Sequence, residues 1–448
     1  MKCRRRFISA SGVMKMSKKE KSPEKKKNRK KKVLKVLGCI LALILAFVIV
    51  TTCISLVGIK SNTNKAQSFP EVGCNLKYEN AGNGVWNIYS DKELKVLQLT
   101  DVHIGAGWMS IRKDSMALNA VAAMISAEKP DLVVVTGDIA YPVPFQAGTF
   151  NNKTSAKMFA TLMEKLGVYW TFAFGNHDTE AYSYFSRKQI SEFYSSGKYP
   201  HCIFEPGPDD VDGYCNQIFN IINSDGIIIR ALMTLDSHSY VDGDYFGIRW
   251  FYDNIHKNQV EWYKNSVQAL AESNAEICKE SPELAAKYAD LCNVVPTSLF
   301  FHIPLTEYKD AWNEYVDNGY KDTENVRFNY GKAGEKGKVV YCGIHEDDLF
   351  ETILELGSTD SVFCGHDHLN NFSVNYKGVD LTYGYSVDYL AYIGIYKLGS
   401  QRGCTVINIA PDGAISFDGQ NYYQDKYLSY YEKEPVEMQV LGDEAQYK

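Results

Sequence analysis

SVFCGHDHLNN, residues 361–371, is the most informative segment of the chain. Its first four residues predict a short buried strand. Directly after that strand, Gly365 is followed by His366, Asp367 and His368. Turn chemistry accounts for a glycine and an aspartate, but it does not account for two imidazoles flanking a carboxylate. The segment therefore predicts a strand whose carboxyl end carries metal ligands.

Four segments upstream repeat this arrangement of a hydrophobic strand followed by polar, metal-type residues. In open α/β folds, ligands gather at the carboxyl ends of the strands. Side chains spread over about 270 positions can therefore converge on one site. The four strands and the residues that follow them are KVLQLT (95–100) before Asp101 and His103, LVVVT (132–136) before Asp138, YWTFAF (169–174) before Asn176, His177 and Asp178, and SLFF (298–301) before His302.

Between and after these strands the pattern alternates, and this alternation predicts a layered α/β fold without internal repeats. Helices are expected where apolar residues recur on one face and end at glycine or proline. The expected helices run from near Asp114 to Pro130, from a cap at Thr154 to Gly167, and over Asn258–Glu272 and Glu346–Leu356. Further strands are expected at Ile227–Leu235, Val406–Ile409 and Ala414–Phe417.

Taken singly, each motif has an ordinary explanation, since a lone histidine is most often a hydrogen-bonded core residue. However, five of the nine histidines lie at strand ends beside Asp, Asn or Gly. Imidazole and carboxylate ligands suit zinc, iron and manganese rather than calcium. Seven such ligands are too many for one tetrahedral ion and suit two ions that share a carboxylate. The remaining histidines lack this setting and are expected to be ordinary: His201, His238, His256 and His345.

This series of motifs, in this order, resembles the calcineurin-like metallophosphoesterases over roughly residues 91–420. The segments FFHIP (300–304) and GHDHLNN (365–371) resemble the branch of that family related to purple acid phosphatases. The resemblance implies a four-layer αββα sandwich, with helices outside and two mixed sheets inside. It also implies a site: Asp101, His103 and His368 would hold a first metal ion, Asn176, His302 and His366 a second, Asp138 would bridge both, His177 would face the substrate, and Asp178 would orient His177.

The activity implied is hydrolysis of phosphate monoesters or diesters with two ions of manganese, zinc or iron. Two cations that share a water lower its pKa toward neutrality, and the resulting hydroxide attacks phosphorus. His177 would protonate the leaving oxygen. Two alternatives stay open: a pyrophosphatase acting on nucleotide or lipid-linked diphosphates, and a non-catalytic membrane-anchored binding protein that keeps the fold.

Tyr141 departs from the family pattern in an informative way. Purple acid phosphatases take a tyrosine ligand three residues after the bridging aspartate, and Tyr141 stands at that register after Asp138. They lack the histidine that this chain supplies as His103. Since one coordination position does not need both, we expect His103 to be the ligand and Tyr141 either to pack against the ligands without binding a metal ion or to face the substrate. This predicts a colourless enzyme.

The N-terminal region predicts a membrane anchor. Residues 36–59 carry no charge and are long enough to span a bilayer core of roughly 30 Å. The basic residues before them favour an N-terminus in the cytoplasm and a body outside it. A cleaved secretory signal is the alternative. The expected organisation is a basic cytoplasmic tail (1–35), the anchor (36–59), a linker (60–84), the catalytic domain (85–424) and a C-terminal tail (425–448).

Charge is distributed unevenly along the chain. Residues 1–35 hold 16 of the 48 basic residues and two of the 54 acidic ones, which leaves a body near −20. A body this acidic repels nucleic-acid backbones, so no nucleic-acid binding is expected. Disulfides are permitted outside the cytoplasm, and Cys202 with Cys215 is a plausible pair.

Overall fold

The computed structural model describes residues 23–436 except for 338, 393–394, 396–400 and 432. Contacts divide the chain into two compact units, Met1–Ile54 and Ser55–Lys448. Part of the expected basic tail (1–22) and of the expected C-terminal tail (437–448) lie outside the described residues.

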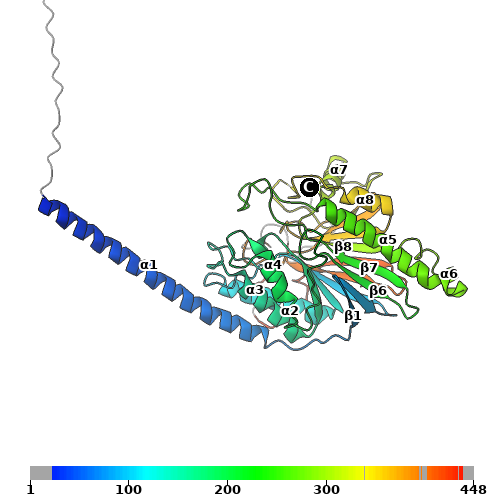
Figure 1. The fold of residues 1–448 in the computed structure, drawn as a ribbon, viewed down its shortest axis with the longest axis horizontal. Coiled ribbons are helices and arrows are strands. Elements are labelled where there is room, and N and C mark those ends of the chain that lie inside the picture. The colour runs from blue at the N-terminus through cyan, green and yellow to red at the C-terminus, as the bar shows by residue number, and fades with distance from the viewer. Residues whose placement is uncertain (1–22, 338, 393–394, 396–400, 432, 437–448) are drawn as a thin grey trace, which may run out of the picture. The chain divides into compact units, whose positions relative to one another are not determined.

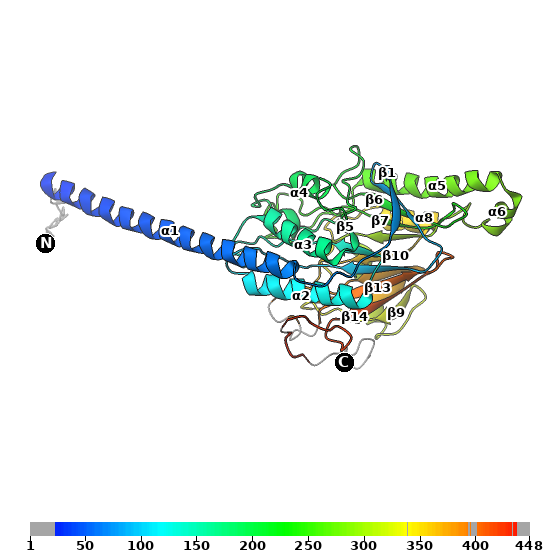
Figure 2. The ribbon, with the colours of Figure 1, turned by 90° about the horizontal axis from the view of Figure 1, so that it is seen from below.

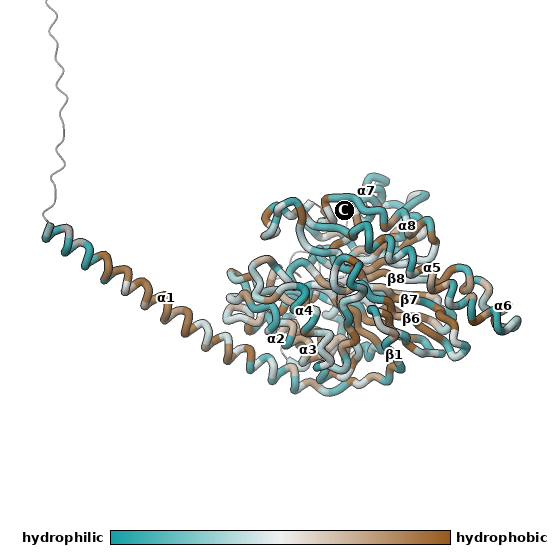
Figure 3. Tube along the Cα trace, viewed as in Figure 1, coloured by the Kyte–Doolittle hydropathy of each residue, from teal (hydrophilic) through white to brown (hydrophobic). Residues whose placement is uncertain are grey.

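The first unit contains most of helix α1, Pro23–Ala66. Its apolar part stands out in Figure 3, and its most hydrophobic 18-residue window has a mean hydropathy of 3.0. At 1.5 Å per residue the helix is about 66 Å long, more than the roughly 30 Å of a bilayer core. The helix is therefore long and apolar enough to cross a membrane.

Residues 60–84, expected to be a linker, are structured. Helix α1 continues to Ala66, which is buried together with Phe69 in the core of the second unit. Strand β1 (Lys77–Gly82) pairs antiparallel with β2 (Val85–Tyr89). The folded unit thus begins well before residue 85.

The second unit is built on two mixed β-sheets (Figure 1). The nine-stranded sheet has the order β1-β2-β6-β7-β8-β10-β12-β11-β9, and the five-stranded sheet has the order β14-β13-β3-β4-β5. The strands not yet placed are β3 (Leu94–Leu99), β4 (Leu132–Thr136), β5 (Tyr169–Ala173), β6 (Gln217–Ile222), β7 (Ile228–Thr234), β8 (Thr297–Phe300), β9 (Val326–Tyr330), β10 (Thr359–Cys364), β11 (Ser373–Tyr376), β12 (Val379–Tyr383), β13 (Gly403–Ile409) and β14 (Ile415–Asn421).

Helices cover the outer faces of both sheets. Helices α2 and α3 lie on one side and α5 and α6 on the other (Figures 1 and 2). The helices of this unit are α2 (Ile111–Glu128), α3 (Asn152–Leu166), α4 (Arg187–Tyr194), α5 (Lys257–Lys279), α6 (Pro282–Lys287), α7 (Thr306–Asp317) and α8 (Leu349–Leu356), and a 3₁₀ turn spans His177–Thr179.

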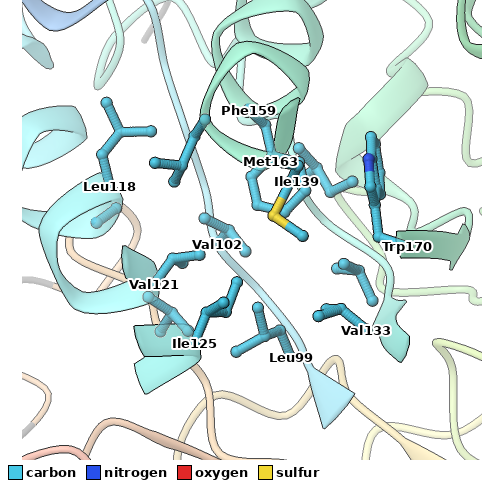
Figure 4. Packing of buried hydrophobic residues seen from close by; sticks show 14 of the residues in the cluster. Leu99, Val102, Leu118, Val121, Ile125, Val133, Ile139, Phe159, Met163 and Trp170 are labelled. Carbon is cyan, nitrogen blue, oxygen red and sulfur yellow. The ribbon is translucent and has the colours of Figure 1, made fainter. Parts of the chain in front are cut away.

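Three hydrophobic clusters separate the layers. One cluster joins α2 and α3 to the five-stranded sheet, where Val121, Ile125 and Met163 pack near Leu99 and Val133 (Figure 4). A second cluster fills the space between the sheets, and a third joins the nine-stranded sheet to α5, α7 and α8. This order of helix, sheet, sheet and helix confirms the expected four-layer sandwich.

Helix α3 begins with a different capping residue from the one expected. Asn151, not Thr154, caps the helix, and its side chain accepts a hydrogen bond from the Thr154 N–H. Thr154 instead lies in the first turn, because Asn151 is an equally good cap placed three residues earlier. The end is as expected, since Gly167 adopts a left-handed conformation there with φ of 67°.

The cysteines also differ from expectation. Cys202 and Cys215 are free thiols, and the Cys215 sulfur accepts a hydrogen bond from the Phe174 N–H. The two sulfurs that lie close together are those of Cys278 and Cys292, 2.7 Å apart beside the short helix α6.

Candidate metal centre

The five predicted motifs lie at the carboxyl ends of β3, β4, β5, β8 and β10. β3, β4 and β5 are parallel neighbours in one sheet, and β8 and β10 are parallel neighbours in the other. Gln98 connects the two sheets beneath these ends, because its Nε2 donates to Thr136 Oγ1 and to the Cys364 carbonyl. The polar residues of both sheets are thereby brought to one place.

Asp138 lies at the centre of this group of polar residues. Its Oδ2 lies 3.2 Å from His103 Nε2 and also 3.2 Å from His302 Nε2. Its Oδ1 accepts a hydrogen bond from the His177 N–H. One carboxylate oxygen thus faces an imidazole from each of the two sheets, as a bridging ligand must.

On one side of Asp138, four side chains form a buried group able to hold a metal ion. Ligand-type atoms of Asp101, His103, Asp138 and His368 all lie within 4.8 Å of one another. Asp101 Oδ1 is 3.4 Å from His368 Nε2, and this oxygen is buried without a hydrogen-bond partner among the described residues. An unpaired buried carboxylate oxygen is costly, and a cation offsets that cost.

On the other side of Asp138, three further donors converge. His302 Nδ1 lies 2.8 Å from the Thr136 carbonyl and so donates to it. His302 Nε2 lies 3.1 Å from Asn176 Oδ1 and 3.2 Å from His366 Nδ1. Burial holds the pKa of His366 well below its usual range, so this ring is neutral. An amide oxygen and two imidazoles around Asp138 are chemically suited to a second transition-metal ion.

The electrostatics of the site also favour positive charge. Burial alone lowers the pKa of His103, but Asp388 and Asp138 outweigh it and raise that pKa to about 10. Burial likewise lowers the pKa of His302, and Asp138 raises it to about 9. Protons and metal ions therefore compete for the same nitrogens, as is usual for metal sites.

Backbone strain is concentrated in the same motifs. Asp101, His103, Asp138 and His366 all have positive φ, at 49°, 52°, 55° and 75°. Such conformations cost about 1–3 kcal/mol each in non-glycine residues and cluster at functional sites. Four of the seven predicted ligands are held in this way.

Gly175 allows the chain to pass close to Asp138. A Cβ at this position would overlap the Asp138 carboxylate, so no other residue fits without displacing it. The glycine that precedes the Asn-His-Asp motif is therefore explained by close packing rather than by a turn.

Asp388 belongs to the centre but lies outside every predicted motif. Its two carboxylate oxygens are 3.1 Å from His103 Nδ1 and 3.6 Å from His368 Nδ1. The N–H groups of Leu390, Ala391 and Tyr392 donate to the same carboxylate. The signal in the sequence is a single acid within an apolar and aromatic segment, YSVDYLAY (385–392).

His177 is oriented by Glu180 and not by Asp178. His177 Nδ1 lies 2.6 Å from Glu180 Oε1. Asp178 instead accepts hydrogen bonds from the N–H groups of Gly175, Asp138 and Ala140. The expected role of Asp178 is thus corrected: its carboxylate points into the loop backbone and holds two motifs together, because three donors converge on it there.

Tyr141 stands beside the centre without pointing its hydroxyl at Asp138. The hydroxyl donates to Gln146 Oε1 at 2.6 Å, while the ring packs 4.6 Å from that of His103 and 4.7 Å from that of His177. Its ring lines a cavity of about 350 Å³ that opens over the centre and is also lined by His177, His366 and His368.

The four histidines expected to be ordinary have polar partners away from this centre. His201 pairs with Glu164, His345 with Asp242, and His238 with Gln259. His256 pairs with two carboxylates, those of Asp212 and Asp253.

Comparison with known proteins identifies the class. Residues 94–370 match the family model of the calcineurin-like phosphoesterases, and the chain belongs to this family.

The chain is similar to three curated plant proteins and one from yeast. It is 28% identical to "Probable inactive purple acid phosphatase 29" of Arabidopsis thaliana over 70% of this chain and 76% of that protein. It is 26% identical to "Probable inactive purple acid phosphatase 14" of the same plant, over 71% and 76%. It is 25% identical to "Phosphatase DCR2" of Saccharomyces cerevisiae, over 62% of this chain and 45% of that protein.

Among solved structures, a dimetal phosphatase from Danio rerio aligns with 74% of this chain and 97% of its own. The sequence identity is 13% and the TM-score is 0.43.

Proposed function

We propose that this chain is a dinuclear metal-dependent hydrolase of phosphate monoesters or diesters. The proposal rests on the position of Asp138 Oδ2, which lies 3.2 Å from His103 Nε2 on one side and 3.2 Å from His302 Nε2 on the other. A carboxylate shared in this way is the arrangement used by two-metal hydrolases.

The seven donors divide between two ions of manganese, zinc or iron. When bound, the ions act as Lewis acids that lower the pKa of water and neutralise charge on phosphate oxygens. We assign Asp101, His103 and His368 to one ion, Asn176, His302 and His366 to the other, and Asp138 to both.

His177 is the general acid in this proposal. Burial lowers the pKa of its imidazole, but Asp138 and Glu180 outweigh burial and leave the pKa above its usual value. The two carboxylates therefore favour the protonated form of this ring. Because Glu180 holds Nδ1, the other ring nitrogen is the one that delivers a proton to the leaving oxygen.

Helix α1 is the anchor in this proposal, and the hydrolase faces away from the cytoplasm. The support is the basic segment before the apolar run, since such segments stay on the cytoplasmic side. Cleavage after the apolar run would give a secreted form instead.

The names of the plant relatives raise the alternative of a binding protein without catalysis. The presence in this chain of every donor that we assign, with the partly buried His177 beside them, supports catalysis. A pyrophosphatase would use the same centre, so the substrate panel includes a diphosphate ester.

The test uses the purified full chain in detergent, loaded with Mn²⁺, Zn²⁺ or iron. We expect two ions per chain and hydrolysis of p-nitrophenyl phosphate or its bis-ester. His177→Ala should keep both ions and lower kcat by about 10²–10⁴-fold. Two bound ions without turnover of any panel member would instead establish a binding protein.

A further inference from the structure

The cavity over the metal centre has aromatic walls. Tyr392 packs 4.8 Å from the His368 ring, and Tyr252 packs 4.3 Å from the His366 ring. Tyr240 lies 5.7 Å from Tyr252, and its hydroxyl donates to Glu180. Aromatic side chains thus surround the place where the alcohol part of a phosphate ester would lie.

Further out, Trp250 and Tyr341 line the mouth of the cavity, with ring centroids 6.0 Å apart. Trp250 is 60% exposed and has a positive φ of 58°, which is a strained conformation for a bulky residue. Because such strain persists only where the structure enforces it, the indole is held at the mouth rather than placed there by chance.

Three carboxyl groups line the cavity wall. Glu180, Glu335 and Asp367 line it, and no lysine or arginine does so among the described residues. The rings of Tyr141, Tyr240 and Tyr252 line the same cavity and offer electron-rich faces.

Glu180 supplies an independent observation. Its Oε1 accepts hydrogen bonds from His177 and Tyr240, whereas its Oε2 is buried without a hydrogen-bond partner among the described residues. A buried, unpaired carboxylate oxygen is unfavourable until a cation or a donor reaches it. The free oxygen and the aromatic walls therefore suit the same ligand group.

We propose that the preferred substrate is a phosphate ester of an ammonium-bearing alcohol, of the choline or ethanolamine class. Aromatic walls beside carboxylates form the usual recognition site for such cations. In the reaction, water loses one proton to solvent and adds to phosphorus as hydroxide, the bond from phosphorus to the alcohol oxygen breaks, and that oxygen takes the proton of His177. A proton from solvent then restores His177. This inference rests on the proposed hydrolase function.

Two kinds of substrate carry such an ammonium group, namely a soluble phosphate ester and a phospholipid with that head group. The loop that carries Trp250 also exposes Tyr245, Phe246 and Ile248, at 73%, 59% and 77%. Exposed aromatic and aliphatic side chains next to the cavity suit contact with a lipid surface, so a lipid substrate is included in the test.

The test compares choline phosphate with 3,3-dimethylbutyl phosphate, which has the same shape but carbon in place of the charged nitrogen. With the metal-loaded full chain in detergent, we expect kcat/KM to be about tenfold higher for choline phosphate. Trp250→Leu and Tyr341→Leu should bring the kcat/KM values of the two esters to within about twofold of each other.

Each other outcome has a distinct meaning. Equal rates for the two esters, with p-nitrophenyl phosphate hydrolysed, would overturn the inference and leave the hydrolase function standing. If no ester is hydrolysed, the hydrolase function fails, and choline binding followed by the fluorescence of Trp250 then decides. Saturable binding that is lost in Tyr341→Leu supports the cation site, and no binding to the wild-type protein overturns it. Faster turnover of phosphatidylcholine in vesicles than of choline phosphate assigns a lipid, and the reverse assigns a soluble ester.

Discussion

Asp388 shows how a residue far from the strand-end motifs supports the centre. It lies within 3.6 Å of both His103 and His368, on the ring nitrogens that face away from Asp138 and Asp101. A carboxylate in this position fixes the imidazole orientation and raises ligand basicity.

We therefore expect Asp388→Asn to weaken metal binding about 10–100-fold, with the fold retained. The measurement is competition with a chelator of known affinity. The matched control is Asp360→Asn, since Asp360 pairs with Arg230 away from the centre. Unchanged affinity in the Asp388 variant would show that this carboxylate does not support the ligands.

A second prediction at the scale of one residue is that Tyr141 does not bind a metal ion. Because its hydroxyl donates to Gln146, it is not expected to bind a metal ion. Iron-loaded protein should lack a strong visible charge-transfer band, and Tyr141→Phe should leave the absorption spectrum unchanged. A strong band that disappears in the variant would make Tyr141 a ligand.

Strands that precede the motifs were predictable from sequence because both of their faces are buried. β4 is buried at every position and has the predicted bounds, Leu132–Thr136. β1 was missed because it is an edge strand, KYENAG, with five of its six residues exposed, so no hydrophobic pattern marks it. Asp388 and Tyr240 were missed because they join the site through contacts between segments far apart in the sequence, which no local pattern encodes. Glu180 was missed although it lies only three residues after His177, because Asp178 is also an acid and stands next to that histidine.

The start of helix α5 gives a prediction for pH dependence. A hydrogen bond to Asp253, assisted by Asp212, raises the pKa of the neighbouring His256 to about 9 against the effect of burial. The unfolded value is about 6.5. Since the folded pKa is the higher, the stabilisation is complete below about pH 6.5 and is lost as pH rises through 9.

At pH 6, the unfolding free energy of the wild-type protein should therefore be higher than that of His256→Gln. The difference should be less than about 1 kcal/mol, because the His256 and Asp212 side chains are partly exposed. At pH 10 this difference should be smaller. Urea unfolding at the two pH values measures it, with His345→Gln as an exposed control. A difference that grows with pH would contradict the assignment.

At the scale of the whole molecule, the second compact unit begins at Ser55. Ala66 and Phe69 belong to the core, and Asn62 donates to the Ile111 carbonyl on α2. A fragment that starts at Asn83 loses these contacts together with β1. We expect Ser55–Lys448 to unfold at a higher temperature than Asn83–Lys448, and calorimetry on both tests this. Equal melting temperatures would show that the intervening segment adds nothing.

The central claim is that two metal ions share Asp138, and paramagnetic resonance of the Mn²⁺-loaded protein tests it most directly. We predict two ions per chain with the spectrum of a spin-coupled pair, and loss of that coupling in Asp138→Asn. Two bound ions with the spectrum of isolated Mn²⁺, or a single ion per chain at saturation, would contradict the claim.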